Sequence, residues 1–220
     1  MLFRSWRENL QALVDGDIVA FRSVASKDPL TEQEVEQRVD FSMQQILSQA
    51  NADTFRTFLT GKGNFRKKVN PEYKANRKDK IPPEHLQYAR QILIDKWGAE
   101  VCTGYEADDG MGLAQDKEGN TTIICTIDKD LDQIPGLHFN WVRGDLYEVT
   151  ELEGTRYLYK QALIGDRVDN IIGVDGIGPK KAAKLLDHLE VELDMYEVVK
   201  GLYDDPERLC MNLECLYIWR

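Results

Sequence analysis

Short apolar runs that alternate with helical periodicities constrain the fold of this chain more than any other feature. Residues 12–16 read Ala-Leu-Val-Asp-Gly, and further strand-like runs occupy 54–59 and 121–126. Between them, apolar residues recur with helical spacing after residue 31 and again over 84–97. Strands separated by helices pair in parallel, because the chain must cross over before it returns to the sheet. The pattern predicts an α/β fold with a doubly wound, mainly parallel central sheet flanked by helices.

The helix expected after residue 31 has a recognisable start, and the helix expected over 84–97 follows the helix-breaking pair Pro82-Pro83. Thr31 and Glu34 have the spacing of a capping box, and Val35, Val39 and Met43 continue with helical periodicity. After residue 150 the pattern becomes mainly helical and contains no low-complexity linker. The sequence therefore predicts an α/β core over residues 1–150 and a helical subdomain over 151–220 that packs on it.

Eight acidic residues are candidate ligands: six lie at strand ends or at a helix start, and two lie in the segment 165–170. They are Asp15, Glu106, Asp108, Asp109, Asp128, Asp130, Asp166 and Asp169. Ligands of doubly wound sheets bind beyond the carboxyl ends of the strands, where several of these acids fall. Taken alone, an acid at a helix start is usually a cap or a partner of the helix dipole. A cluster of so many carboxylates is destabilising unless cations neutralise it, and hard oxygen ligands select Mg²⁺ or Mn²⁺. The joint pattern predicts a divalent-metal site.

Basic residues are concentrated in one segment of an acidic chain. The formal charge is −10, yet residues 62–80 hold eight basic residues against two acidic ones. The eight are Lys62, Arg66, Lys67, Lys68, Lys74, Arg77, Lys78 and Lys80. The segment is either a solvated charged loop or a surface that binds phosphate beside an acidic body that binds metal.

Composition argues against several other classes of protein. No run reaches the roughly 18 to 20 apolar residues that a membrane helix needs, and the N-terminal eight residues lack the apolar stretch of a signal peptide. We therefore expect a cytoplasmic protein without membrane contact. The four cysteines have no C-x-x-C spacing, so zinc and disulfides are not expected. The residues indicate no protein partner.

Five separated segments resemble one enzyme family. They are Val14-Asp15-Gly16; Phe65-Arg66 with Tyr73-Lys74-x-Asn76-Arg77; Gly104-Tyr-Glu106-Ala-Asp108-Asp109; Asp128-Lys-Asp130-Leu; and Gly165-Asp166-x-x-Asp169-Asn170-Ile-x-Gly173-Val-x-Gly176-Ile-Gly178-x-Lys180. This order resembles the PIN-like 5′-to-3′ exonuclease and flap endonuclease family, which includes the 5′-nuclease domain of bacterial DNA polymerase I. The sequence is most similar to the exonucleases of short-tailed phages.

The resemblance implies a fold, a reaction and a division of labour among the residues. It implies a resolvase-like α/β core, a helical arch at about 61–83 and a helix-hairpin-helix-like motif at about 165–190. Two metal ions, Mg²⁺ or Mn²⁺, would support hydrolysis of DNA at a 5′ end or 5′ flap, and of RNA primers in RNA–DNA hybrids. Such activity serves DNA replication or genome degradation in a bacteriophage. Asp15, Glu106, Asp108, Asp109 and Asp128 would build the first metal site, and Asp130, Asp166 and Asp169 mainly the second.

The resemblance also assigns residues to DNA. Lys74 and Arg77 are the candidate catalytic cations, because helical spacing would bring them to one face. The candidate DNA-binding residues are Lys62, Arg66, Lys67, Lys68, Tyr73, Lys78, Gly176, Gly178, Lys180 and Lys181. Tyr73 and Phe65 either stack on a base or pack into the core. Residues 173–178, which we call the glycine hairpin, could be an ordinary turn. In the family such a hairpin would offer backbone amides to duplex phosphates and can hold K⁺ through its carbonyls.

One position departs from the family pattern. Thr60 stands where family members often have an aspartate, and Asp17 either compensates as a metal ligand or caps a helix. Two other functions compete with nuclease activity. A non-catalytic DNA-binding replication accessory protein would be expected to have lost the acids. A related toxin-like metal-dependent ribonuclease would lack the arch motif and the glycine hairpin.

Overall fold

A six-stranded sheet forms the centre of the computed structural model, which describes residues 9–220. Residues 1–8, where we expect no signal peptide, lie outside the described residues. The sheet order is β3-β2-β1-β4-β5-β6. The strands are β1 (Gln11–Asp15), β2 (Thr54–Thr60), β3 (Glu100–Cys102), β4 (Thr122–Cys125), β5 (Gly136–Asn140) and β6 (Asp145–Val149). Within this six-stranded sheet only β5 and β6 pair antiparallel, so the predicted mainly parallel sheet is confirmed.

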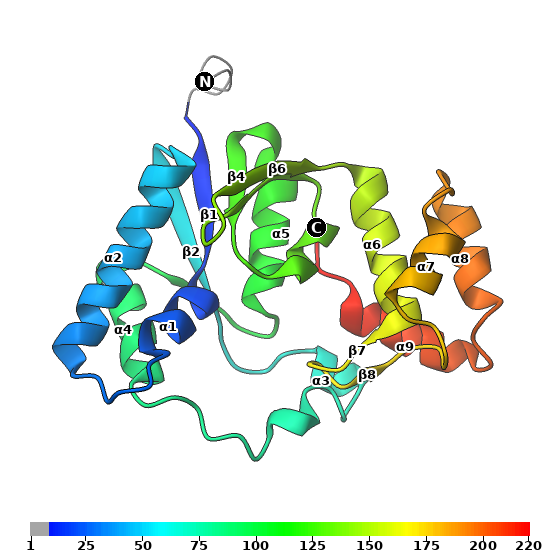
Figure 1. Cartoon of the computed structure of the whole chain (residues 1–220), viewed down its shortest axis with the longest axis horizontal. Helices are drawn as coiled ribbons and strands as arrows, with labels where there is room; N and C mark the ends of the chain where they lie inside the picture. Colours follow the sequence, from blue (N-terminus) through cyan, green and yellow to red (C-terminus); the bar gives the residue numbers. More distant parts are fainter. Residues whose placement is uncertain (1–8) are drawn as a thin grey trace.

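Helices cover both faces of the sheet (Figure 1). One face is covered by α1 (Gly16–Val24), α2 (Glu32–Ala50) and α4 (Leu86–Trp97), which contact one another. The other face packs against α5 (Ala107–Glu118), which contacts β1, β2 and β4. Because both faces are buried, the central strands have apolar side chains in both directions: Val14 belongs to the first core and Leu13 to the second.

The register brings the carboxyl ends of the strands to one edge. Asp15, the last residue of β1, pairs with Phe58 of β2, and Val14 pairs with Cys125 of β4. The loops that follow these strands, together with the start of α5 after β3, therefore open at the same end of the sheet. That edge is where the predicted acids gather.

Most of the predicted elements are present, with shifted ends. The predicted strand at 54–59 extends to Thr60, and the capping box at Thr31 and Glu34 forms as expected. The helix expected from residue 84 begins at Leu86. The short strand β3 and the hairpin of β5 and β6 are not predicted by the sequence pattern, because they are short and only half-buried.

The basic segment forms a connection that leaves the sheet, reaches the C-terminal helices and returns to α4 (Figure 1). We call residues 61–85 the strap. It contains only the four-residue helix α3 (Arg66–Val69) and the 3-10 turn η1 (Ala75–Arg77). The expected helical arch is therefore mostly irregular in this structure. Pro71 and the pair Pro82-Pro83 explain this, because proline cannot donate the hydrogen bonds of a helix interior.

After β6 the chain is mainly helical. The elements are α6 (Glu151–Ile164), β7 (Gly165–Asp166), β8 (Ile171–Ile172), α7 (Pro179–Leu186), α8 (Glu192–Lys200) and α9 (Pro206–Leu216). They surround a hydrophobic core of their own, which also takes in Tyr73 of the strap. After α9 the chain runs back to the sheet, where Ile218 joins the core beneath α5. None of the helices within residues 9–220 is long and apolar enough to cross a membrane.

Candidate active site

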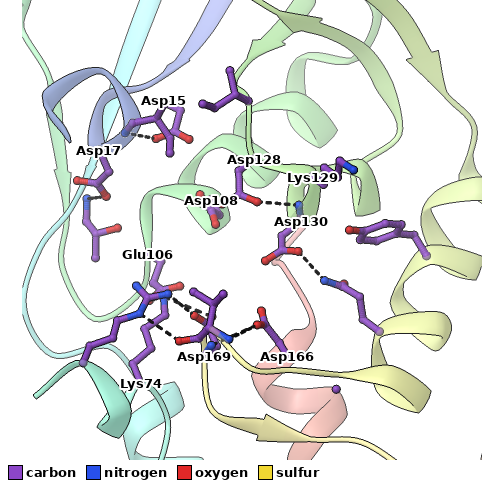
Figure 2. A pocket seen from close by; sticks show the side chains of 18 of the residues that line it. Asp15, Asp17, Lys74, Glu106, Asp108, Asp128, Lys129, Asp130, Asp166 and Asp169 are labelled. Atoms are coloured by element: carbon purple, nitrogen blue, oxygen red, sulfur yellow. Dashed lines mark hydrogen bonds and ion pairs between the residues drawn. The ribbon is translucent and has the colours of Figure 1, made fainter. Parts of the chain in front are cut away.

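A cleft of about 770 Å³ opens at the carboxyl edge of the sheet, between the core, the strap and the loop that joins β7 to β8. Seven of the eight predicted metal ligands line it. They are Asp15, Glu106, Asp108, Asp128, Asp130, Asp166 and Asp169. Figure 2 shows their side chains converging from several segments that are far apart in sequence. The fold thus brings together most of the acids that the sequence singled out.

Most of these acids lie at the end of a regular element or in its first turn, and Asp169 lies in the β7–β8 loop. Asp15 ends β1 and caps α1, where its side chain accepts from the Ile18 amide. Glu106 caps α5, which puts Asp108 in the first turn. Asp128 caps the 3-10 helix η3 (Lys129–Gln133) after β4 and accepts from the Asp130 amide at 3.0 Å. The capping role and the position in the cleft are therefore compatible at the same residue.

The carboxylates raise one another's pKa. Burial raises the pKa of Asp108 well above its ordinary value, and the charges of Asp15, Asp128 and Glu106 add to this. Burial and Asp17 likewise raise the pKa of Asp15, against a 2.7 Å hydrogen bond from Thr126. Burial raises the pKa of Asp130 to about 7, with Asp128 contributing. The cleft holds more negative charge than its own cations neutralise, which favours a bound cation.

Two strap cations enter the cleft. Lys74 Nζ lies 2.5 Å from Glu106 Oε1 and 3.5 Å from Asp169 Oδ2. Arg77 donates to Asp169 Oδ1 at 2.6 Å and to the Val168 carbonyl. The sequence reasoning placed Lys74 and Arg77 on one helical face, and this is wrong: Lys74 has φ 58°, and the 3-10 turn begins after it. The two cations nevertheless meet at Asp169.

The structure corrects the assignments of Asp109 and Arg66. Asp109 is fully buried and does not line the cleft, so it is not placed to bind metal. Arg66 is buried as well, and its guanidinium donates to both Asp109 oxygens at 2.6 and 2.8 Å. A buried charge needs a partner of opposite sign, and these two residues satisfy each other. Arg66 therefore does not face DNA as the sequence reasoning expected.

Tyr73 packs into the structure rather than offering its ring for stacking. It is buried, and its hydroxyl donates to Glu106 at 3.1 Å and Asp169 at 2.8 Å. Burial, with both carboxylates, raises its pKa well above the ordinary value, so the hydroxyl stays a donor. Phe65 stacks on Trp219 at 4.8 Å. Neither aromatic ring is placed as a platform for a base.

The remaining DNA-binding candidates lie on the surface. The exposed ones are Lys62, Lys67, Lys68 and Lys78 of the strap, and Gly176, Gly178, Lys180 and Lys181 at the hairpin and the start of α7. Gly176 has φ +67°, a conformation in which other residues are strained.

Thr60 and Asp17 belong to a brace at the end of β2. Asp17 accepts from the Thr60 amide at 2.9 Å and forms an ion pair with Arg90 of α4. The Thr60 hydroxyl accepts from the Ala107 amide, at the start of α5. Asp17 is thus already paired, although it lines the cleft.

Several residues of the site carry no sequence signal. Gln161 of α6 donates to Asp130 at 2.7 Å, Thr126 donates to Asp15, and Asn64 donates to Glu106 at 2.7 Å. Each is a lone polar residue whose partner lies at least 31 positions away in the chain. Only the folded structure places them beside the acids.

Comparisons with known proteins agree with this arrangement. Residues 11–161 match the sequence profile described as the 5′-3′ exonuclease, N-terminal resolvase-like domain. The chain is 30% identical over 222 residues to DNA polymerase I of Bacillus subtilis, covering 86% of this chain and 25% of that protein. It is 32% identical over 198 residues to thermostable DNA polymerase I of Thermus aquaticus, covering 80% of this chain and 23% of that protein. The chain thus spans about a quarter or less of the curated relatives that it matches.

Solved structures with similar folds include nucleases bound to metal or DNA. The 5′-exonuclease of bacteriophage T5 with bound zinc superposes with a TM-score of 0.76 at 23% identity, over 95% of this chain and 89% of that one. The catalytic core of Rad2 in complex with DNA superposes with a TM-score of 0.55 at 15% identity, over 93% and 73%. At these sequence identities the similarity shows a shared fold and nothing more.

Proposed function

The chain belongs to the 5′-3′ exonuclease family, and we propose that it is a divalent-metal-dependent 5′-nuclease that hydrolyses phosphodiester bonds of DNA. The observation that supports this most strongly is the cleft itself. The seven predicted ligands, together with Asp17 and with the cations Lys74, Arg77 and Lys129, line one cavity at the carboxyl end of a parallel sheet. Such a set of groups suits phosphoryl transfer, which depends on positioning and on charge stabilisation.

The residues present fit a pair of Mg²⁺ ions, with Mn²⁺ as a substitute. Asp15, Glu106, Asp108 and Asp128 would hold the first ion, and the second would lie with Asp130, Asp166 and Asp169. The all-oxygen donor set and the raised pKa values of Asp108 and Asp130 support this. When bound, such ions activate water and stabilise negative charge on the scissile phosphate and the leaving oxygen.

Cation binding requires side chains to move. Within residues 9–220 no three potential ligands converge closely enough, as they stand, to hold one ion. Two of the acids are held by strap cations instead, Glu106 by Lys74 and Asp169 by Arg77. These ion pairs would open when a phosphate and its counter-ions enter, which would free the carboxylates and release both cations toward the substrate.

Lys74 is the cation best placed for chemistry. Burial alone would lower its pKa, but the charges of Glu106 and Asp169 outweigh this and keep it raised, so the ammonium stays protonated. Once released from Glu106, this ammonium would lie beside the reacting phosphate and stabilise the charge that develops there. Arg77, which is partly exposed, would contact the same phosphate from the outer side of the strap.

DNA would reach the cleft over two surfaces. The exposed strap lysines would attract the single-stranded 5′ end, and Lys180 and Lys181 would lie near phosphates of the duplex. The turn at 173–176 borders a second cavity of about 660 Å³, and the backbone carbonyls of this turn would hold a K⁺ ion. These contacts read backbone rather than base edges, so recognition depends on the structure of the DNA.

A cleavage assay tests this function. A DNA duplex with a 5′-labelled flap and a blunt 5′-labelled duplex are incubated with the protein in millimolar Mg²⁺, in Mn²⁺ and in EDTA. An RNA-primed duplex tests action on hybrids, and a flap with a blocked 5′ end serves as the control. We expect metal-dependent release of short products from the free 5′ end. Binding of the flap without cleavage in either metal would favour the alternative, a DNA-binding accessory protein on the same scaffold.

A further inference from the structure

Asp109, the buried neighbour of the cleft acid Asp108, has all its acceptor positions filled. Asp109 Oδ1 accepts from Arg66 Nη2 at 2.8 Å and from the Trp219 amide at 3.1 Å. Asp109 Oδ2 accepts from Arg66 Nη1 at 2.6 Å and from the Glu106 amide at 2.9 Å. The last of these bonds fixes the start of α5, and with it the direction in which Glu106 and Asp108 point.

The same arginine holds the end of α9 and the residues that follow it. Arg66 Nε donates to the Cys215 carbonyl, and Nη2 donates to the Tyr217 carbonyl, each at 2.8 Å. We call residues 215–219 the clasp, because its backbone meets both members of the buried pair. Gly112 of α5 allows this close approach, since a Cβ there would overlap the Trp219 carbonyl. The start of α5 is therefore bound to the clasp through backbone groups.

The clasp also reaches the opposite side of the cleft through two glutamines. The Ile218 amide donates to Gln133 Oε1, and Gln133 Nε2 donates to the Leu216 carbonyl and to Gln161 Oε1. Gln161 Nε2 in turn donates to Asp130 Oδ1 at 2.7 Å. Each amide can face only one way in this relay, because a flip would set like groups against each other. The clasp thus orients the amide that holds Asp130.

Stability alone does not account for this arrangement. A buried ion pair contributes little compared with apolar residues of the same volume, since desolvation offsets its attraction. The hydrogen bonds instead connect the clasp to the two sides of the cleft. Partners that orient ligating carboxylates typically change metal affinity by 10-fold or more when removed.

We propose that the clasp is a positioning device, whose backbone amides hold the carboxylates on both sides of the cleft in place for divalent cations. It acts through Asp109 on Glu106 and Asp108, and through Gln133 and Gln161 on Asp130. The inference rests on the proposed metal-dependent function, but its test needs no DNA cleavage.

Two substitutions at one position isolate the amide. Trp219→Pro removes the N–H that donates to Asp109, whereas Trp219→Ala removes only the side chain that stacks on Phe65. Mn²⁺ binding by the metal-free protein is measured by electron paramagnetic resonance. Amide hydrogen exchange is followed without metal in peptides that cover residues 104–112. Relative to Trp219→Ala, we expect Trp219→Pro to weaken Mn²⁺ binding about tenfold and to speed exchange at the start of α5 at least about threefold.

A second variant tests the hydrogen bonds that run from the clasp through Gln133 and Gln161 to Asp130. It also provides a test if the first variant does not fold. Gln133→Met breaks the relay to Gln161 and should weaken Mn²⁺ binding at least about threefold relative to wild type, with exchange over residues 104–112 close to that of wild type. Cooperative thermal unfolding of each variant is the folding control, and if Trp219→Pro does not fold, Gln133→Met decides. A Mn²⁺ affinity of Trp219→Pro equal to that of Trp219→Ala, together with a wild-type affinity of Gln133→Met, would overturn the proposal. Wild-type protein that binds Mn²⁺ tightly but cleaves no DNA would overturn the proposed function and leave the clasp standing.

Discussion

At the scale of single residues, some groups contact the cleft acids directly, and others only hold neighbouring residues in place. Lys74 contacts two cleft acids directly, while Arg66 and Asp109 contact each other away from the cavity. The distinction decides what a substitution changes. A group beside the reacting phosphate affects turnover, whereas a distant attractor affects binding.

Lys74 and Lys67 make a matched pair for that distinction. Lys67 is exposed on the strap, whereas Lys74 is partly buried between Glu106 and Asp169. We expect Lys74→Ala to lower single-turnover cleavage at saturating DNA at least about tenfold, or about 1.4 kcal/mol in the barrier. Lys67→Ala should mainly raise KM. If both substitutions changed KM alone, Lys74 would be only one more attractor of DNA.

Residue roles were predictable from the sequence only where a motif places the residue directly in the cleft. The seven acids of the cleft follow strand ends and helix starts, which local patterns indicate. Asp109 belongs to the same motif, yet its partner Arg66 lies 43 positions away. No local pattern distinguishes a carboxylate that faces a cavity from its neighbour that faces a buried guanidinium, because burial is set by tertiary packing.

At the scale of elements, the strap and the hairpin are the parts that would meet DNA. Residues 72–77 of the strap are fastened to the β7–β8 loop by backbone and side-chain hydrogen bonds, including Lys74 N to Asp169 O at 2.9 Å and Asn76 to the Arg167 carbonyl at 2.7 Å. The strap and the loop before the hairpin are thus one connected surface. The helical arch expected for this segment is not continuous in the structure, because its prolines interrupt helical hydrogen bonding.

The start of α7 has a separate role that salt dependence can isolate. Lys180 and Lys181 are exposed and lie outside the cleft, so they should bind duplex phosphate without affecting chemistry. We expect the double variant Lys180→Ala with Lys181→Ala to weaken duplex binding and to reduce the slope of log affinity against log salt by roughly one unit for each lost contact. Turnover at saturating DNA should change little. An unchanged slope together with a large loss of turnover would contradict this role.

At the scale of the whole molecule, an acidic body and a basic strap meet at one edge of the sheet. The sequence predicted the parallel sheet and the acidic edge, because strand and helix periodicities are local. It did not predict how the chain after α9 returns beneath α5, since that contact joins residues such as Trp219 and Asp109 that are 110 positions apart. The whole molecule is therefore needed to assemble the cleft from its segments.

The central claim is that the acids of this cleft perform metal-dependent DNA cleavage, and Asp108 tests it most directly. Asp116 lies on the same helix, is exposed and does not line the cleft, so Asp116→Asn is the matched control. Single-turnover cleavage of a 5′-labelled flap in Mg²⁺ is measured for wild type and for both variants. Asp108→Asn should lower the rate at least about 100-fold, since it removes a negative ligand from the cation site, and Asp116→Asn should cleave like wild type. Equal rates for Asp108→Asn and Asp116→Asn would contradict the assignment of the active site.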